Sequence, residues 1–97
     1  MAFDLSKRAQ QDLEDIYDFT VAEFGLNQAD SYVLEFKASF VHLSENPKIG
    51  RERSEIRKGL RSLAKDNHII FYRIIKTRTF IVRILHGSRD LPKQFLP

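Results

Sequence analysis

The chain has no cysteine and no long apolar run. The lack of cysteine excludes a disulfide framework, a thiolate nucleophile and a zinc–thiolate site, so nothing ties the protein to an oxidising compartment. The first ten residues, MAFDLSKRAQ, contain no signal-peptide apolar stretch. No apolar run approaches the ~20 residues of a membrane-spanning helix. We therefore expect a cytoplasmic protein that has no membrane partner.

Linkers and repeats are also missing from the sequence. No low-complexity tract and no Pro/Gly/Ser-rich stretch interrupts the 97 residues, of which 42% are hydrophobic and 30% charged. That balance is typical of a folded globular protein. We expect one domain covering residues 1–97.

The charges divide sharply between the two halves of the chain. Residues 1–47 carry 3 Lys+Arg and 9 Asp+Glu, a net charge of 3 − 9 = −6, and residues 48–97 carry 13 and 4, a net charge of 13 − 4 = +9. A basic half suits an anionic partner such as a phosphate backbone or an acidic protein. The alternative is two solvated faces that attract each other.

Two helices are predicted in the first half, after a short strand around Phe3 and Leu5. Ser6 is a suitable N-cap for the first helix, whose apolar residues recur every three or four positions until Gly25. Asn27 can cap a second amphipathic helix that ends at the segment ENP, because the residue before a proline disfavours helical geometry. The short connection predicts an antiparallel helical pair.

The second half predicts strands. A basic, irregular segment leads into a short strand around residues 60–63, and the stretch HIIFYRIIKTRTFIVRILH reads as a hairpin. A three-residue loop over residues 76–78 would place Arg73 opposite Ile81, Phe71 opposite Arg83 and His68 opposite His86.

This register predicts one apolar face and one face that carries the arginines. We expect the helices to cover the apolar face, which consists of Ile70, Tyr72, Ile74, Phe80, Val82 and Ile84. Arg73 and Arg83 would then lie on the open face together with Ile69, Phe71, Ile81 and Leu85, since burying unpaired arginines would cost several kcal/mol.

Catalytic and metal-binding patterns are weak. The three histidines lack metal-ligand spacing, and the chain has neither a G-x-S-x-G motif nor a glycine-rich phosphate loop. The acidic residues Asp12, Glu14, Asp15 and Asp18 are best explained as a solvated face of the first helix. We expect no catalytic residue, metal or cofactor, although arginine and histidine together could support RNA cleavage.

Two sets of residues are candidates for binding. The arginines at positions 57, 61, 73, 83 and 89 suit phosphate or carboxylate, because the guanidinium group forms paired hydrogen bonds with both; ordinary salt bridges to the helices are the alternative. Phe19, Leu34 and Val41 lie beside or off the main apolar stripes. They indicate either a wide buried face or a groove for a partner's helix.

Taken together, several segments closely resemble the ParE toxins of the RelE/ParE toxin–antitoxin superfamily. They are AQQDLEDIYDFTVAEFG, ENPKIGRERSEIRKGLRSLAKDNHIIFYRI and IVRILHGSRDLP, which between them cover nearly the whole chain. The resemblance implies an α+β fold with two antiparallel helices packed on one face of a small antiparallel sheet, in the order β-α-α-β-β-β. It also implies that the protein is not an enzyme.

In function, the resemblance implies a toxin of a type II toxin–antitoxin system. Such a toxin inhibits DNA gyrase by stabilising the cleaved-DNA complex, is neutralised by a cognate antitoxin protein, and meets operator DNA only through that antitoxin. One alternative is a RelE-like ribosome-dependent mRNA endonuclease. RelE relatives commonly use a tyrosine near the C-terminus, where this chain reads SRDLPKQFLP. Another alternative is an attenuated homologue that acts only as a binding module.

Site residues follow from the same resemblance and from the binding sets above. For the target, gyrase or nucleic acid, we expect contacts from Arg61, Arg73, Arg83, His86, Arg89, Phe95 and Leu96. For the antitoxin, we expect contacts from Phe19, Leu34, Val41 and Arg57.

Overall fold

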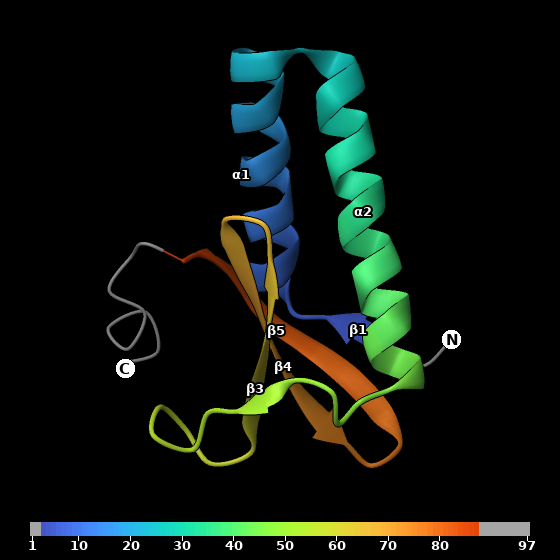
Figure 1. The fold of residues 1–97 in the computed structure, drawn as a ribbon, viewed down its shortest axis with the longest axis vertical. Coiled ribbons are helices and arrows are strands. Elements are labelled where there is room, and N and C mark those ends of the chain that lie inside the picture. Colours follow the sequence, from blue (N-terminus) through green and yellow to red (C-terminus); the bar gives the residue numbers. More distant parts are fainter. Residues whose placement is uncertain (1–2, 88–97) are drawn as a thin grey trace.

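The computed structural model describes residues 3–87, which form two helices and five strands (Figure 1). Both helices cover the same face of one five-stranded sheet with the strand order β1-β5-β4-β3-β2. This arrangement confirms the predicted α+β fold. The elements in chain order are β1 (Phe3–Leu5), α1 (Lys7–Phe24), α2 (Leu26–Glu45), β2 (Arg51–Glu52), β3 (Leu60–Lys65), β4 (His68–Ile75) and β5 (Arg78–His86).

The helix boundaries agree with the sequence except at the start of α2. The Ser6 hydroxyl accepts a hydrogen bond from the Ala9 N–H (2.9 Å), which confirms Ser6 as the N-cap of α1. Gly25 ends α1 with a positive φ of 93°, and its carbonyl already accepts the first hydrogen bond of α2, from Ala29 (3.1 Å). The connection is therefore a single residue, and the prediction that Asn27 caps α2 was wrong.

The two edge strands differ in how far they were predicted: β1 confirms the short strand expected around Phe3 and Leu5, whereas β2 was not predicted. β1 pairs with β5 in parallel, with Phe3 opposite Thr79, so the sheet is mixed rather than wholly antiparallel. β2 adds a two-residue strand at the other edge, where Arg51 lies opposite Ser62. The predicted strand around residues 60–63 is confirmed as β3 and continues to Lys65.

The β4–β5 hairpin has the predicted register only in the half that is distant from its loop. His68 lies opposite His86 and Phe71 opposite Arg83, as expected. A β-bulge then shifts the register by one residue, so that Arg73 lies opposite Phe80 instead of Ile81, and the loop shrinks to residues 76 and 77.

This shift changes which side chains face the helices. Ile81 belongs to the helix-facing core and is 0% exposed, whereas Val82 packs on the opposite face and Phe80 pairs with Arg73 of the open face. The predicted faces of these three residues were therefore wrong. The helix-facing core comprises Ala9, Phe36, Phe40, Leu43, Ile70, Tyr72, Ile81 and Ile84. Within residues 3–87, no helix combines the length and the apolar character needed to cross a membrane.

A second, smaller core lies on the face of the sheet that the helices leave open. Leu60, Phe71 and Leu85 are buried there, with Ile56, Ile69 and Val82 packed against them. The segment 53–59 folds over this cluster, held by a hydrogen bond from the Arg53 N–H to the Leu60 carbonyl (2.8 Å). The open face is therefore partly covered by the chain itself.

Candidate partner-binding surfaces

A groove of about 440 Å³ lies between the helical pair and the turn that joins β3 to β4. We call it the inner groove. Its apolar wall includes Phe19 and Phe24, which are 64% and 69% exposed. Large apolar side chains at such exposure are typical of a surface that a partner covers. The complete lining is Ile16, Phe19, Thr20, Phe24, Gln28, Tyr32, Glu35, Asp66, Asn67, His68 and His86.

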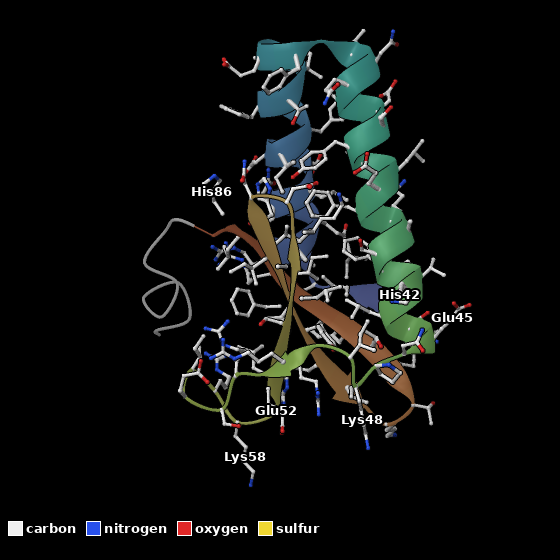
Figure 2. All side chains as sticks on the ribbon, in the orientation of Figure 1. His42, Glu45, Lys48, Glu52, Lys58 and His86 are labelled. Atoms are coloured by element: carbon white, nitrogen blue, oxygen red, sulfur yellow. The ribbon has the colours of Figure 1, made fainter. Side chains whose placement is uncertain are left out.

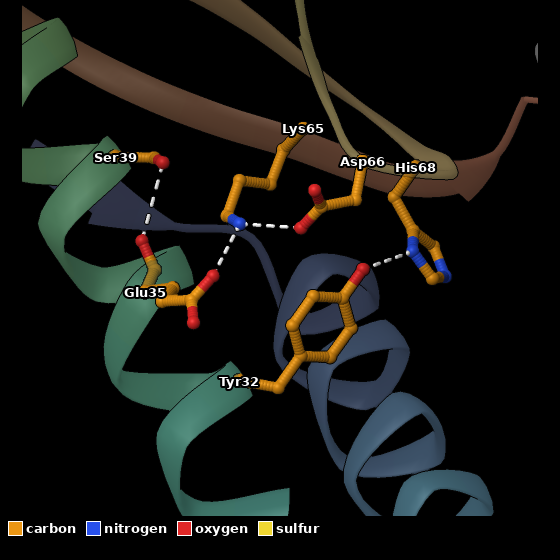
Figure 3. A network of polar contacts seen from close by, with 6 residues as sticks. All are labelled: Tyr32, Glu35, Ser39, Lys65, Asp66 and His68. Atoms are coloured by element: carbon orange, nitrogen blue, oxygen red, sulfur yellow. Dashed lines mark hydrogen bonds and ion pairs between the residues drawn. The ribbon is translucent and has the colours of Figure 1, made fainter. Parts of the chain in front are cut away.

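Polar contacts form the opposite wall of the inner groove (Figure 3). The Lys65 ammonium group lies 2.6 Å from both the Asp66 and the Glu35 carboxylates, and these two hydrogen bonds raise the pKa of Lys65. The Tyr32 hydroxyl is hydrogen-bonded to His68 Nδ1 (2.9 Å), and burial raises the pKa of Tyr32. These contacts tie α2 to the β3–β4 turn.

The predicted histidine pair is confirmed in the same wall. The rings of His68 and His86 have centroids 5.4 Å apart and stand nearly perpendicular, at 79°. His68 also packs edge-on against Phe36, with centroids 5.7 Å apart. Among residues 3–87, no group of three or more histidine or acidic side chains could hold a metal ion.

The four predicted antitoxin contacts do not meet at one place. Phe19 lines the inner groove, but Leu34 (65% exposed) and Val41 (half-buried) lie on α2 and are not part of its lining. Arg57 lies in the segment between β2 and β3, at the opposite end of the molecule from the tip of the helical pair (Figure 1). These residues remain predictions as antitoxin contacts.

Arg83 lies opposite Phe71, as the predicted register requires, but its side chain is not presented to solvent as predicted. Its Nε and Nη2 atoms donate to the two oxygens of Asp12 on α1 (2.8 and 3.1 Å), and both side chains are only 12% exposed. The same carboxylate accepts the backbone N–H of Ile84 (2.9 Å). Asp12 thus caps the edge of β5 beyond the end of β1, and its assignment to a solvated acidic face was also wrong.

Arg61 supports the segment that follows α2. Its Nη1 atom donates to the carbonyls of Gly50 (2.7 Å) and Lys48 (3.3 Å). In the same region the Tyr72 hydroxyl donates to the Pro47 carbonyl (2.7 Å) and accepts from the Gly50 N–H (2.9 Å). A Cβ atom at Gly50 would collide with that hydroxyl. Strand periodicity marks Tyr72 only as a core residue, so this role could not be predicted from the sequence.

Arg73 does lie on the open face, as predicted, and is exposed. Its guanidinium group lies beside Gly59, where a Cβ atom would be 3.8 Å from Nη2. Nearby, Arg53 stacks over the ring of Phe71 (5.6 Å) and donates to Glu55 (2.7 Å), a position that the sequence reasoning missed. The other predicted target contacts, Arg89, Phe95 and Leu96, lie outside the described residues.

Comparison with known proteins identifies the family. A family profile described as "ParE toxin of type II toxin-antitoxin system, parDE" matches residues 3–91. The chain is 39% identical over 90 residues to Toxin ParE1 of Mycobacterium tuberculosis, covering 92% of each protein. It is 36% identical over 86 residues to Toxin ParE1 of Caulobacter vibrioides, covering 89% of this chain and 88% of that toxin.

Solved structures agree at the level of the fold. A chain of the chromosomal ParDE toxin–antitoxin system from P. aeruginosa superposes with a TM-score of 0.79 at 23% identity, covering 91% of this chain and 97% of that one. The isolated E. coli RelE toxin superposes with a TM-score of 0.63 at 15% identity, covering 96% and 92%. On the profile match and the identities with curated ParE toxins, the chain belongs to the ParE toxin family of type II toxin–antitoxin systems.

Proposed function

We propose that this toxin acts in the cytoplasm by stabilising the cleaved-DNA complex of DNA gyrase, and that a cognate antitoxin neutralises it. Membership of the ParE family supports the choice of gyrase. The toxin has two separate surfaces, which supports an action through binding two different partners. The apolar inner groove borders the helical pair, whereas the exposed Arg73 lies on the open face of the sheet.

The antitoxin would bind in the inner groove. An amphipathic segment can place its apolar side chains against Phe19 and Phe24, where the exposed area is large. Parts of the antitoxin that continue beyond the groove would then contact Arg57, Leu34 and Val41. Operator DNA would be contacted only through the antitoxin.

Two arginines that could stabilise charge in a nuclease reaction are engaged in structural contacts instead. Arg61 donates to backbone carbonyls and Arg83 is paired with Asp12. An arginine held in this way has few donors left for a transferring phosphoryl group. This arrangement favours a target-binding role for the toxin over bond-breaking chemistry. Of the predicted target contacts, Arg73 is exposed and is the one we propose for the target surface. Arg61 and Arg83 are held in the contacts above and His86 lines the inner groove, while Arg89, Phe95 and Leu96 lie outside the described residues.

A gyrase assay tests the proposal directly. Purified toxin should increase gyrase-dependent double-strand cleavage of a supercoiled plasmid, and the small protein encoded by the adjacent reading frame should abolish the effect. Ribosomes translating a defined mRNA serve as the second arm and should remain active. Cleavage of the ribosome-bound mRNA, with gyrase unaffected at excess toxin, would overturn the proposal and identify a ribonuclease.

A further inference from the structure

We propose that the open face of the sheet binds the phosphodiester backbone of duplex DNA directly. The face in question, which we call the cationic face, comprises Arg53, Arg57, Lys58 and Arg73. Arg57, Lys58 and Arg73 are exposed, and Arg53 anchors the segment that carries two of them. The choice of DNA rests on the proposed action at gyrase, where the toxin would meet the cleaved duplex.

The cations are held close together by the fold. The guanidinium group of Arg73 lies beside Gly59, and Gly59 directly follows Arg57 and Lys58 in the chain. β3 and β4 pair so that Leu60 lies opposite Arg73, which fixes the loop against the strand. Figure 2 shows Lys58 projecting from the end of the molecule that is distant from the tips of the helices.

The loop that carries the cations is preorganised. The Arg57 N–H donates to the Arg53 carbonyl (3.1 Å), and the Leu60 N–H donates to the Arg57 carbonyl (3.1 Å). Beneath it, Ile56 packs on the small core of the open face. A rigid cationic loop loses little conformational freedom when it binds an anion, which favours binding.

The residue types on the cationic face favour nucleic acid over protein as its binding partner. Protein interfaces take most of their affinity from a few aromatic and apolar anchors, whereas phosphate contacts come from arginine and lysine. Here the apolar side chains lie under the loop, since Leu60 and Phe71 are 1% and 0% exposed. The acidic side chains nearby are Glu52, which is exposed, and Glu55, which is paired with Arg53.

The salt dependence of DNA binding, measured without gyrase, tests this inference. We would titrate toxin into a short fluorescent DNA duplex and follow anisotropy at several salt concentrations. Contacts from Arg57, Lys58 and Arg73 should give a slope of log affinity against log salt of about −2.7, or roughly a 40-fold loss between about 50 and 200 mM salt. The double variant Lys58→Ala/Arg73→Ala should have a slope of about −0.9 and lose only about 3.5-fold over that range.

The matched control is Lys37→Ala, which removes one exposed positive charge from α2, on the other side of the sheet. It should retain the wild-type slope, and thermal melts should show that all variants fold. A zero slope for the parent, an equal effect of Lys37→Ala, or tighter binding to an RNA duplex would each overturn the inference. So would a double variant that binds DNA normally but binds the antitoxin weakly. Because gyrase is absent here and present in the plasmid assay, the two proposals fail separately.

Discussion

Replacing Asp12 should destabilise the fold far more than its position on a helix suggests. Its carboxylate accepts two bonds from Arg83 and one from the Ile84 N–H, and both charged side chains are 12% exposed. Removing one partner of a buried pair costs about 3–5 kcal/mol, and the residual exposure places Asp12→Ala near the lower limit, at about 3 kcal/mol. For a domain of this size the melting temperature should fall by roughly 12–24 °C.

Thermal and urea melts of five variants, Asp12→Ala among them, check this reasoning. Asp12→Asn keeps an oxygen for the Ile84 N–H but loses the charge, so it should cost less, about 1.5 kcal/mol. The double variant Asp12→Ala/Arg83→Ala should cost no more than Asp12→Ala, because the pair is already broken. Glu14→Ala, an exposed acid on the same helix, is the control and should stay within about 0.5 kcal/mol of the parent. If Arg83→Ala is as harmless as Glu14→Ala, the ion pair does not hold α1 to β5.

Three further outcomes are expected. Because the bulge buries Ile81 in the helix-facing core, Ile81→Ala should lower the free energy of unfolding by about 2–5 kcal/mol and Val82→Ala by markedly less in denaturant melts. The reverse order would instead support the hairpin with a three-residue loop. Phe19→Ala should leave the melting temperature nearly unchanged yet weaken antitoxin binding at least about tenfold by calorimetry, and undiminished affinity would exclude the inner groove. The pKa of Lys65 is raised, so its stabilising effect relative to Lys65→Met should be complete below the ordinary lysine pKa of 10.5 and decline as the pH rises above it; a constant difference would show that its acidic partners do not matter.

Most of the correct fold prediction came from sequence signals that act over short distances along the chain. The cap at Ser6, the stop at Gly25 and the proline after Asn46 each act within one helical turn, so the sequence reveals them. The bulge escaped prediction because one register was assumed for the whole hairpin, and only a three-residue loop then keeps Arg83 off the apolar face. The structure instead combines a two-residue loop with the predicted register beyond the bulge. A shift of one residue then exchanged the faces of Ile81 and Val82.

The candidate site depended on contacts between distant parts of the chain. Asp12 and Arg83 are separated by 71 residues, and no spacing rule relates them. Phe19 and Leu34 were predicted as surplus apolar residues, either in a wide buried face or in a groove, and the structure exposes both. Their placement on different surfaces depends on how the helical pair is rotated against the sheet. Rotation of this kind is set by side-chain packing, which periodicity alone does not describe.

The parallel pairing of β1 with β5 has a consequence for synthesis of the chain. Residues at the start of the protein contact β5 across 74 to 76 positions, through Arg78 to Asp4 and through the Ser6 hydroxyl to the Val82 carbonyl. While the ribosome is still making the middle of the chain, β1 and the start of α1 have no sheet edge to join. The helical pair can form early from local contacts, but its sheet-facing side stays uncovered until β5 has emerged. A growing chain therefore cannot complete the toxin fold until nearly all the described residues have been translated, so a partially made toxin presents the helices without the assembled sheet.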